Sequence, residues 1–302
     1  MKKVDLKIGF LCNNNCLFCV QGHKKAFGNR KTSEQLREHI HRSANEGYKA
    51  IVFTGGEPTI HPDIIDLVKY ARGMGFTLIQ IQSNGRRFAY IDFCKEMIKA
   101  GANQFAPSVH GPTPEIHDYL THAKGAFAQA ILGIKNLKQL KQDVITNTVI
   151  TKLNYRYLPH IAELLVYLRV DQFQLAFVHV LGNAEKNFSL IVPQKSLVAP
   201  FVKKALDISK NTRVRAMTEA IPYCFMRGYE RYVAEDKIPD TKVFDLDNTI
   251  ENFTESRKVQ CKIKADKCQG CVYFKKCEGP WKEYPEHFGW EEFKPVRLPS
   301  SV

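Results

Sequence analysis

Short apolar strands alternate with amphipathic helices through the first two thirds of the chain, and this alternation restricts the fold more than any other feature. Six strands are predicted, at residues 4–10, 50–54, 77–82, 104–109, 143–151 and 171–180. Helical periodicity occupies the intervals, at residues 33–45, 63–74, 88–100, 125–140 and 158–168. Strands that alternate with helices indicate a parallel sheet of right-handed βαβ units. Six such units predict an α/β fold, a partial (β/α)6 barrel rather than a closed barrel of eight strands.

Polar and glycine-bearing segments follow the predicted strands. Residues 12–16 come after the first strand, 54–58 after the second, 83–85 after the third, 108–111 after the fourth and 182–183 after the sixth. In parallel barrels the carboxyl ends of the strands meet at one face, which carries the reactive groups. The sequence therefore predicts a functional site at that face.

The composition is that of an ordinary globular protein, and it excludes disordered and collagen-like chains. The 302 residues are 44% hydrophobic and 25% charged. No apolar run approaches the roughly 18 residues that a membrane span needs. Asp5 and Lys7 interrupt the stretch that a signal peptide would keep apolar. We therefore expect no membrane segment and a cytoplasmic protein.

The formal net charge of +13 lies in the first 223 residues, because the remaining residues carry equal numbers of acidic and basic side chains. Such a balance suits an anionic partner or a solubilising surface. No block of five or more Lys and Arg residues occurs, and aromatic residues do not alternate with a basic stripe. Dedicated nucleic-acid binding is therefore disfavoured.

Nine cysteines in a cytoplasmic chain indicate metal ligation, since thiols in that compartment are kept reduced. Cys94 stands alone in a predicted helix and is interpreted as a small buried hydrophobic residue. The other cysteines form two groups, Cys12, Cys16 and Cys19 near the start and Cys224, Cys261, Cys268, Cys271 and Cys277 near the end. The segment after residue 223 is short for an independent hydrophobic core, so a metal or a disulfide is expected to stabilise it, and the clustered cysteines supply the candidate.

The first cysteine group supplies three thiolates from one loop, with no fourth cysteine nearby. A structural zinc site normally takes four protein ligands, and His23 is a candidate for the fourth. Three cysteines on a [4Fe–4S] cluster instead leave one iron open for a substrate or cofactor. Both interpretations follow from the residues alone.

The first cysteine group and a glycine motif together resemble the radical S-adenosylmethionine (radical SAM) superfamily. The pattern Cys12-x3-Cys16-x-Phe18-Cys19 directly follows the first strand, and Gly-Gly-Glu-Pro at residues 55–58 follows the second. The resemblance covers the predicted barrel as a partial TIM-type (β/α)6 fold. It implies that the three cysteines hold a [4Fe–4S] cluster whose open iron binds S-adenosyl-L-methionine. One electron then cleaves this cofactor to methionine and a 5′-deoxyadenosyl radical, which abstracts a hydrogen atom.

The resemblance also implies a set of cofactor-binding residues. Gly55 and Gly56 would let the backbone approach the methionine ammonium, and Glu57 would place negative charge beside it. The remaining candidates are Ser83, Asn84 and Ser108 toward the ribose or the methionine carboxylate, Gly182 and Asn183 on the adenine side, and Phe18 near the adenine or the cluster. Packing in the core is the alternative for Phe18, and an ordinary turn is the alternative for residues 83–85. No residue is assigned as general acid or base, and His110 is either a structural or a substrate-facing histidine.

The second cysteine group resembles auxiliary-cluster domains of the SPASM/Twitch type, in the spacing Cys268-x2-Cys271-x5-Cys277. A full SPASM domain carries about seven cysteines for two clusters, so the five present here imply one auxiliary [4Fe–4S] cluster. Its expected ligands are Cys224, Cys268, Cys271 and Cys277, with Cys261 as the alternative. Zinc also suits four cysteines. The expected domains are a radical SAM partial barrel over residues 1–210 and the auxiliary-cluster domain over residues 211–302.

These resemblances predict a radical SAM oxidoreductase or maturase that abstracts a hydrogen atom from a peptide or protein residue, with the auxiliary cluster assisting oxidation or bond formation. The first alternative is the same chemistry on a small anionic metabolite, as alcohol oxidation or cyclisation. The second is a non-enzymatic iron–sulfur or zinc protein in regulation or electron transfer. A reductase such as flavodoxin or ferredoxin is the expected electron source. The first strand begins within a few residues of Met1, so no N-terminal peptide-recognition domain is expected in this chain.

Overall fold

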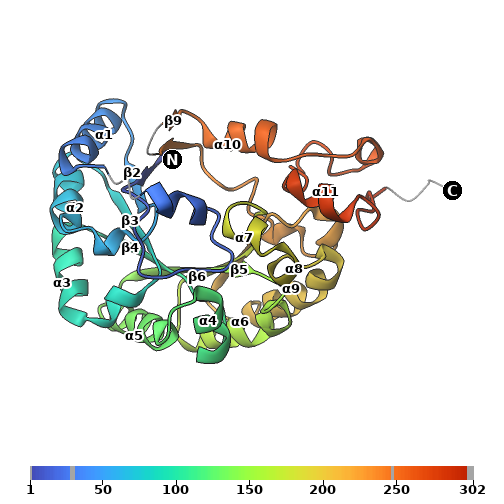
Figure 1. Cartoon of the computed structure of the whole chain (residues 1–302), viewed down its shortest axis with the longest axis horizontal. Coiled ribbons are helices and arrows are strands. Elements are labelled where there is room, and N and C mark those ends of the chain that lie inside the picture. The colour runs from blue at the N-terminus through green and yellow to red at the C-terminus, as the bar shows by residue number, and fades with distance from the viewer. Residues whose placement is uncertain (1, 28–30, 246–247, 298–302) are drawn as a thin grey trace.

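A curved sheet of nine strands is the framework of the computed structural model, which describes residues 2–27, 31–245 and 248–297 (Figure 1). The strands are β1 (Lys3–Lys7), β2 (Ala50–Thr54), β3 (Leu78–Ser83), β4 (Gln104–Pro107), β5 (Asp143–Ile150), β6 (Gln172–Phe177), β7 (Arg215–Glu219), β8 (Thr241–Phe244) and β9 (Thr249–Ile250). Their order is β7-β6-β5-β4-β3-β2-β1-β8-β9, and neighbouring strands are parallel except for β8 and β9. The α/β partial-barrel class is confirmed.

All six strands predicted from the sequence are present, within a few residues of the expected bounds. Two further parallel strands extend the sheet beyond the prediction, since β7 pairs with β6 and β8 pairs with β1. Both come from residues after 210, so this part of the chain contributes to the barrel as well as to the tail, which is defined here as residues 220–297. The division into domains at residue 210 stays a prediction.

Helices cover the convex face of the sheet (Figure 1). The main ones are α1 (Ser33–Asn45), α2 (Ile64–Gly73), α3 (Ile91–Ala100), α5 (Ala126–Gln139), α6 (Leu158–Tyr167) and α9 (Lys195–Ser209). Helix α1 begins where the sequence predicts, because Thr32 and Gln35 form a capping box. The sequence did not indicate the shorter helix α4 (Pro114–Thr121), which follows β4.

The two faces of the barrel strands differ in polarity. In β5, alternate residues are buried, and Val144 and Ile150 belong to the hydrophobic core beneath the helices. The opposite face carries polar side chains into the barrel, where Gln80 donates to Gln104 at 2.8 Å and Gln104 donates to Asp143 at 2.6 Å. The interior of the barrel is therefore hydrophilic rather than filled with apolar side chains.

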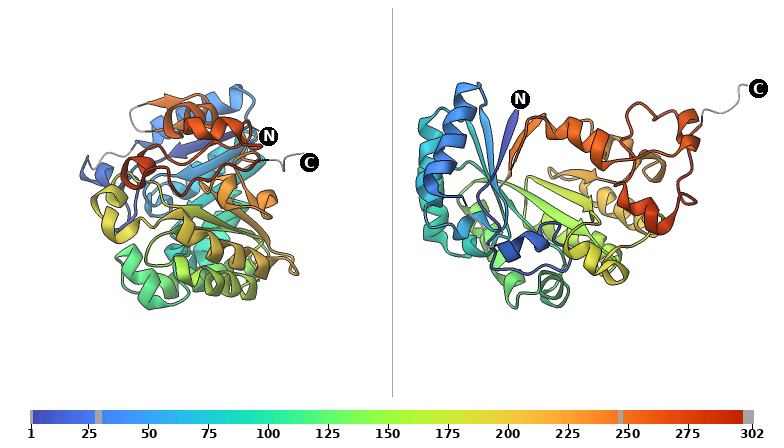
Figure 2. Two further views of the ribbon diagram at one scale, coloured as in Figure 1. Left: turned by 90° about the vertical axis from the view of Figure 1, so that its right-hand side faces the viewer. Right: turned by 45° about the horizontal axis from the view of Figure 1, so that its top comes forward.

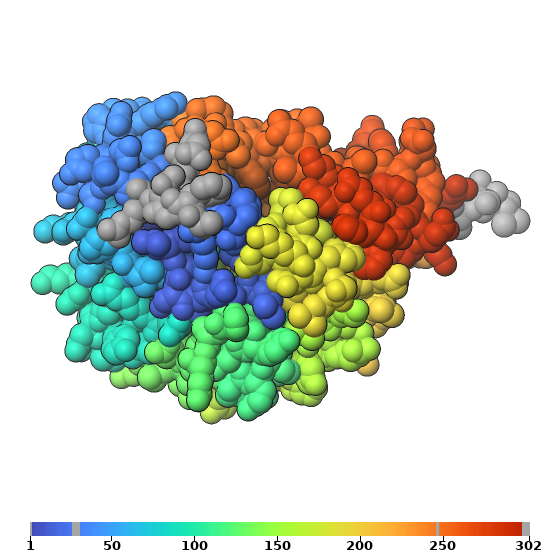
Figure 3. Space-filling view, viewed as in Figure 1, coloured from blue at the N-terminus to red at the C-terminus, as the bar shows by residue number. Residues whose placement is uncertain are grey.

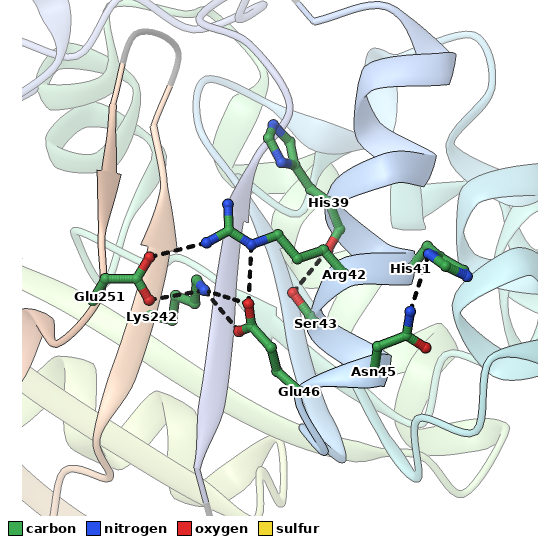
Figure 4. Close-up of polar contacts among 8 residues, drawn as sticks. All are labelled: His39, His41, Arg42, Ser43, Asn45, Glu46, Lys242 and Glu251. Carbon is green, nitrogen blue, oxygen red and sulfur yellow. Dashed lines mark hydrogen bonds and ion pairs between the residues drawn. The ribbon is translucent and has the colours of Figure 1, made fainter.

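An ionic network fixes the β8–β9 hairpin to the end of α1 (Figure 4). Lys242 on β8 is 1% exposed at its side chain, and its Nζ lies 2.7 Å from Glu46 and 2.8 Å from Glu251. Arg42 contacts the same two carboxylates at 2.9 and 3.3 Å. Because β8 pairs with β1, this network also supports the strand that leads into the first cysteine group.

After β8 the tail crosses to the other side of the barrel, where α11 (Glu283–Phe288) lies (Figures 1 and 2). Three shorter helices accompany it, α7 (Asn183–Lys186), α8 (Phe188–Ile191) and α10 (Phe253–Ser256). On the face in Figure 3 the red end of the tail borders the yellow α7–α8 segment, and Phe188 stacks on His287 at 3.9 Å. No helix within residues 2–27, 31–245 and 248–297 has the length and apolar character that crossing a bilayer requires.

Candidate active site

The loop that follows β1 carries the first cysteine group and is called the cysteine loop here (residues 8–22). The end of β2 holds this loop, because Gly56 N donates to Gly9 O at 2.7 Å and Glu57 N donates to Leu11 O at 2.8 Å. A Cβ on Gly55 would lie 2.3 Å from Gly9 O, and a Cβ on Gly56 would lie 2.2 Å from Leu11 O. The close approach of the loop backbone therefore requires both glycines, a second reason beside the cofactor contact expected from the sequence.

The three thiols of the cysteine loop line one cavity of about 390 Å³ at the carboxyl ends of the barrel strands. Six of the predicted cofactor residues line the same cavity: Phe18, Gly55, Gly56, Ser83, Asn84 and Ser108. Burial raises the pKa of Cys12, Cys16 and Cys19, so a metal must displace protons to bind them. His23, considered as a fourth zinc ligand, is exposed and lies outside the lining of this cavity.

Glu57 lies behind the cavity wall and holds two of the lining residues. Its carboxylate is 3% exposed and accepts hydrogen bonds from Thr59 N (3.0 Å), Thr59 Oγ1 (2.5 Å), Ser83 Oγ (2.8 Å) and Asn84 N (2.6 Å). Burial raises the pKa of Glu57, and these donors act in the opposite direction. Asn84 Nδ2 in turn lies 4.0 Å from Cys12 Sγ. Glu57 therefore positions the turn after β3 against the cysteine loop.

Gly182 and Asn183 contact the cysteine loop from the side of β6. Asn183 N donates to Cys19 O at 2.9 Å, and Asn183 Nδ2 donates to Cys16 O at 2.9 Å. Gly182 has φ +63°, and a Cβ there would lie 2.5 Å from Val20 O. Both residues thus support the loop from outside the described lining of the cavity, and their adenine-side role stays a prediction.

Phe18 packs edge-on against His110, with 4.6 Å between ring centroids. His110 Nδ1 accepts a hydrogen bond from Val149 N at 3.2 Å, and His117 Nδ1 accepts one from His110 N at 3.1 Å. Burial lowers the pKa of His117 to about 4 and that of His110 well below its usual range, so both rings are neutral and carry their hydrogen on Nε2. Both histidines line the cavity and offer it N–H donors.

Buried polar atoms without partners gather on this cavity. Among the described residues, five buried side-chain polar atoms have no hydrogen-bond partner, and four of them belong to residues of the cavity lining: Gln21 Oε1, His117 Nε2, Asn147 Oδ1 and Trp281 Nε1. An unpartnered buried donor or acceptor costs on the order of 1–3 kcal/mol. Their concentration here indicates that a ligand completes the site.

Of the lining residues that the sequence analysis missed, four form the half of the cavity away from the cysteine loop. Asp5 lies on the inward face of β1, and Glu219 ends β7. His179 follows β6, and its ring stacks on Trp281 of the tail with centroids 3.9 Å apart. The inward alternation of β1 could have revealed Asp5, whereas β7 and the docking of the tail have no clear sequence signal.

The tail cysteines form a second site. Cys224, Cys268, Cys271 and Cys277 all line one small cavity of about 30 Å³. Burial raises the pKa of Cys224 to about 12, and the charges of the other three thiols act in the same direction. Cys261 does not line this cavity and instead lies beside Glu283. The chain thus places together the four cysteines expected as ligands, although their ligation stays a prediction.

Each cysteine group is a candidate metal site because its thiols line one cavity, not because they already stand in the geometry of metal ligands. Among the described residues, no three His, Cys, Asp or Glu side chains are arranged to hold a metal ion as they stand. The shared cavities, and the chemistry of three and four thiol donors, nevertheless fit iron–sulfur clusters. Cys94 is fully buried in the core, as expected for a structural cysteine.

Solved structures with a similar fold include SuiB of Streptococcus suis bound to S-adenosylmethionine, with a TM-score of 0.67 and 15% identity over 99% of this chain and 76% of that chain. SuiB bound to the precursor peptide SuiA gives a TM-score of 0.66 at 14% identity, over 99% and 75% of the two chains. A structure of anSMEcpe with AdoMet and the Kp18Cys peptide gives a TM-score of 0.59 at 17% identity, over 71% and 63%. These likenesses concern the fold.

Curated relatives include an AdoMet-dependent heme synthase of Oleidesulfovibrio alaskensis, 24% identical over 76% of this chain and 58% of its own length. A Fe-coproporphyrin III synthase of Methanosarcina barkeri is 30% identical over 56% and 41%. The chain thus spans about half the length of such relatives. The sequence profile of the radical SAM superfamily matches residues 6–165, more than half of the chain. With the cysteine loop and the glycine turn at the strand ends inside that span, the chain belongs to the radical SAM superfamily.

Proposed function

We propose that this protein abstracts a hydrogen atom from a residue of a peptide or protein. The observation that carries the proposal is the single cavity in which three loop thiols, the turns after β2, β3 and β4, and four unpartnered polar atoms meet. Membership of the radical SAM superfamily implies a [4Fe–4S] cluster and S-adenosyl-L-methionine. When bound, these groups supply a 5′-deoxyadenosyl radical that abstracts a hydrogen atom.

The chain itself holds and orients these groups. Cys12, Cys16 and Cys19 are the proposed cluster ligands. Glu57 fixes Ser83 and Asn84, which face the cavity beside the cysteine loop. Phe18 of the cysteine loop packs against His110, and the neutral rings of His110 and His117 line the same cavity.

The tail is proposed to hold an auxiliary [4Fe–4S] cluster on Cys224, Cys268, Cys271 and Cys277, which line one cavity. Such a group, with four protein thiolates, would supply an electron acceptor for oxidation or bond formation in the substrate. Zinc is the alternative metal for the same four thiols. A flavodoxin or ferredoxin is the proposed source of electrons for the reaction.

The choice of a peptide rests on similar structures that contain peptides, SuiB and anSMEcpe, of which SuiB matches 99% of this chain and hence the tail as well. The curated relatives favour the alternative, the same chemistry on a small anionic metabolite. Their names include heme synthase and GTP 3′,8-cyclase, whose substrates are small molecules. The two readings share every proposed residue of the cysteine loop.

Two measurements on the anaerobically reconstituted protein test the cofactor assignment. Two clusters predict about eight irons per chain, falling to about four in the Cys12/Cys16/Cys19→Ala variant and to about four in the Cys224/Cys268/Cys271/Cys277→Ala variant. Cys261→Ala serves as the matched control and should keep all of them. With dithionite, the wild type should release 5′-deoxyadenosine and the first variant none. A wild-type protein that binds iron but releases no 5′-deoxyadenosine would be a non-enzymatic iron–sulfur protein.

Isotope transfer separates the two substrate classes. Extract from cells grown in deuterated medium is divided into a peptide and protein fraction and a small-metabolite fraction, and each is incubated with the enzyme. Hydrogen-atom abstraction places one deuterium in 5′-deoxyadenosine, which mass spectrometry detects. Deuterium transfer from the peptide and protein fraction is expected. Transfer from the metabolite fraction alone would replace the proposal by its alternative.

A further inference from the structure

We propose that the half of the cavity away from the cysteine loop recognises a basic peptide side chain, an ammonium or guanidinium group, through Asp5 and Glu219. The inference rests on the proposed function and names the substrate class of the same site. It starts from the charges that reach the cavity surface. Among the described lining residues, Asp5 and Glu219 are the carboxylates, and Lys25 is the single lysine or arginine.

Lys25 belongs to the other half of the cavity. Its Nζ donates to Asn14 O in the cysteine loop, and its charge acts on Cys12, Cys16 and Cys19. The far half therefore presents carboxylates without a lining cation. Asp5 accepts a hydrogen bond from Thr54 Oγ1, and Glu219 accepts one from Gln174 Nε2. Each is thus held in place by a neutral donor.

Cations lie behind these two carboxylates, and most have partners of their own. Lys7 pairs with Asp245 at 2.8 Å, and Arg257 pairs with Glu278 at 2.8 Å. Lys262 lies 3.9 Å from Glu235. Burial lowers the pKa of Lys3 and the charges of Asp5 and Glu219 both act to raise it, yet Lys3 does not line the cavity. A ligand that enters this half therefore contacts the carboxylate oxygens and not these cations.

Two of the unpartnered buried atoms point to the same ligand chemistry. Asn147 Oδ1, an acceptor without a partner, belongs to the same lining, on β5 opposite Gln174, the residue that donates to Glu219. Trp281 is 7% exposed, its ring already stacks on His179, and Lys262 Nζ lies over it at 3.9 Å from the centroid. The indole therefore serves the ligand through its unpartnered Nε1–H rather than through stacking.

A basic peptide residue satisfies this arrangement. Its charged N–H groups meet Asp5, Glu219 and Asn147, while a backbone carbonyl can accept from Trp281 Nε1. A phosphate or carboxylate would instead set its oxygens against three acceptors, and the unpaired groups would weaken its binding. The net charge of +13, which suggested an anionic partner, therefore does not extend to this half of the cavity.

Binding of three capped tripeptides that differ only in the central residue tests the inference. Lysine, norleucine and glutamate peptides are titrated by calorimetry into the reconstituted protein with S-adenosyl-L-methionine. We expect the lysine peptide to bind about tenfold or more tightly than the norleucine peptide, as charged hydrogen bonds allow. Equal binding of lysine and norleucine, or preference for glutamate, would overturn the proposal.

Variants test whether the preference for the lysine peptide depends on Asp5 and Glu219. Asp5→Asn with Glu219→Gln should bring the lysine-to-norleucine ratio close to one. Asp143→Asn, an inward carboxylate of β5 outside the described lining, is the matched control and should keep the ratio. Should the double variant not fold, Trp281→Phe keeps an aromatic ring, removes the indole N–H, and should weaken the binding of all three peptides alike. An unchanged ratio in a folded double variant contradicts the assignment.

The proposed function fails separately. Release of 5′-deoxyadenosine by the wild type is measured in the same samples. This release does not depend on which tripeptide binds more tightly. Release without a preference overturns only the inference on Asp5 and Glu219. Absence of release overturns the proposed function, whatever the tripeptides do.

Discussion

At the scale of single residues, Glu57 shows how a buried carboxylate can serve a cofactor site without facing it. All four of its hydrogen-bond partners are donors, from Thr59, Ser83 and Asn84. In Glu57→Gln the amide NH2 must face one of these donors, which leaves it unsatisfied at a cost of about 1–3 kcal/mol. We expect lower stability in urea and weaker binding of S-adenosyl-L-methionine, measured by equilibrium dialysis. Glu163→Gln, an exposed position on α6, is the control; a larger loss in the control would contradict this account.

Gly182 allows a second prediction at this scale, because two constraints coincide there. Its φ is +63°, and a Cβ would lie 2.5 Å from Val20 O and 2.8 Å from Cys19 O. Gly182→Ala should displace the cysteine loop and reduce the iron bound by the barrel after reconstitution. Gly228→Ala is the matched control, since Gly228 has φ +79° and open space around it. The control should lose about 1 kcal/mol of stability and keep its iron. Equal iron in both variants would show that the loop tolerates the contact.

At the scale of elements, the sequence predicts the strands that repeat a pattern and misses those that do not. The six strands with helices between them stand out by periodicity, and the first cysteine group and Gly55-Gly56-Glu57 lie at their ends as predicted. Strand β7 has mixed exposure along its five residues and carries no alternation that would reveal it. Helix α4 is only eight residues long and half polar, yet it brings His117 to the cavity. Trp281 reaches the site only because the tail folds back, which no local pattern encodes.

Within the tail, one ion pair joins two elements, and it supports the third prediction. Arg257 and Glu278 are 1% and 4% exposed at their side chains and meet through two hydrogen bonds of 2.9 and 2.8 Å. Removing one partner of a buried pair costs about 3–5 kcal/mol. Glu278 follows Cys277 directly, so Arg257→Met should lower both the stability of the tail and its iron content, leaving about four irons per chain.

An apolar replacement of both partners separates charge from packing in this pair. Arg257→Met with Glu278→Leu leaves no buried charge unpaired, so stability should recover in part relative to Arg257→Met alone. Urea unfolding and iron analysis of the three proteins give the comparison. A double variant less stable than the single one would mean that the pair acts through its hydrogen bonds rather than through charge balance.

At the scale of the whole molecule, the two candidate sites are joined by one short segment of the tail. Gly279 and Pro280 line the cavity of the tail cysteines, and Trp281, the next residue, lines the cavity of the barrel. The same segment is anchored by Lys262, whose backbone forms an antiparallel bridge with Trp281. The sheet order brings this about, because β8 returns to β1 before the chain crosses the barrel. The two candidate sites are therefore parts of one packed unit.

The pH dependence of stability, a property of the whole molecule, is the last prediction. His117 is 1% exposed, and burial lowers its pKa from about 6.5 to about 4. Above pH 6.5 the ring is neutral in the folded and unfolded chains, so its contribution is fully present. As the pH falls, the unfolded chain takes up a proton that the folded chain refuses, and stability is lost progressively toward pH 4. The loss from this residue should be on the order of 2–3 kcal/mol.

The carboxylates also titrate in this range, so the test compares two proteins. His117→Gln retains an acceptor for His110 N and lacks the titrating group, while every other group is shared. The difference in unfolding free energy between wild type and variant should therefore shrink as the pH falls from 7 to 4. Parallel profiles would mean that the folded chain can protonate the ring, with Nδ1 exchanging the His110 N–H for an acceptor. That outcome would also remove the argument that His117 offers the cavity a fixed neutral donor.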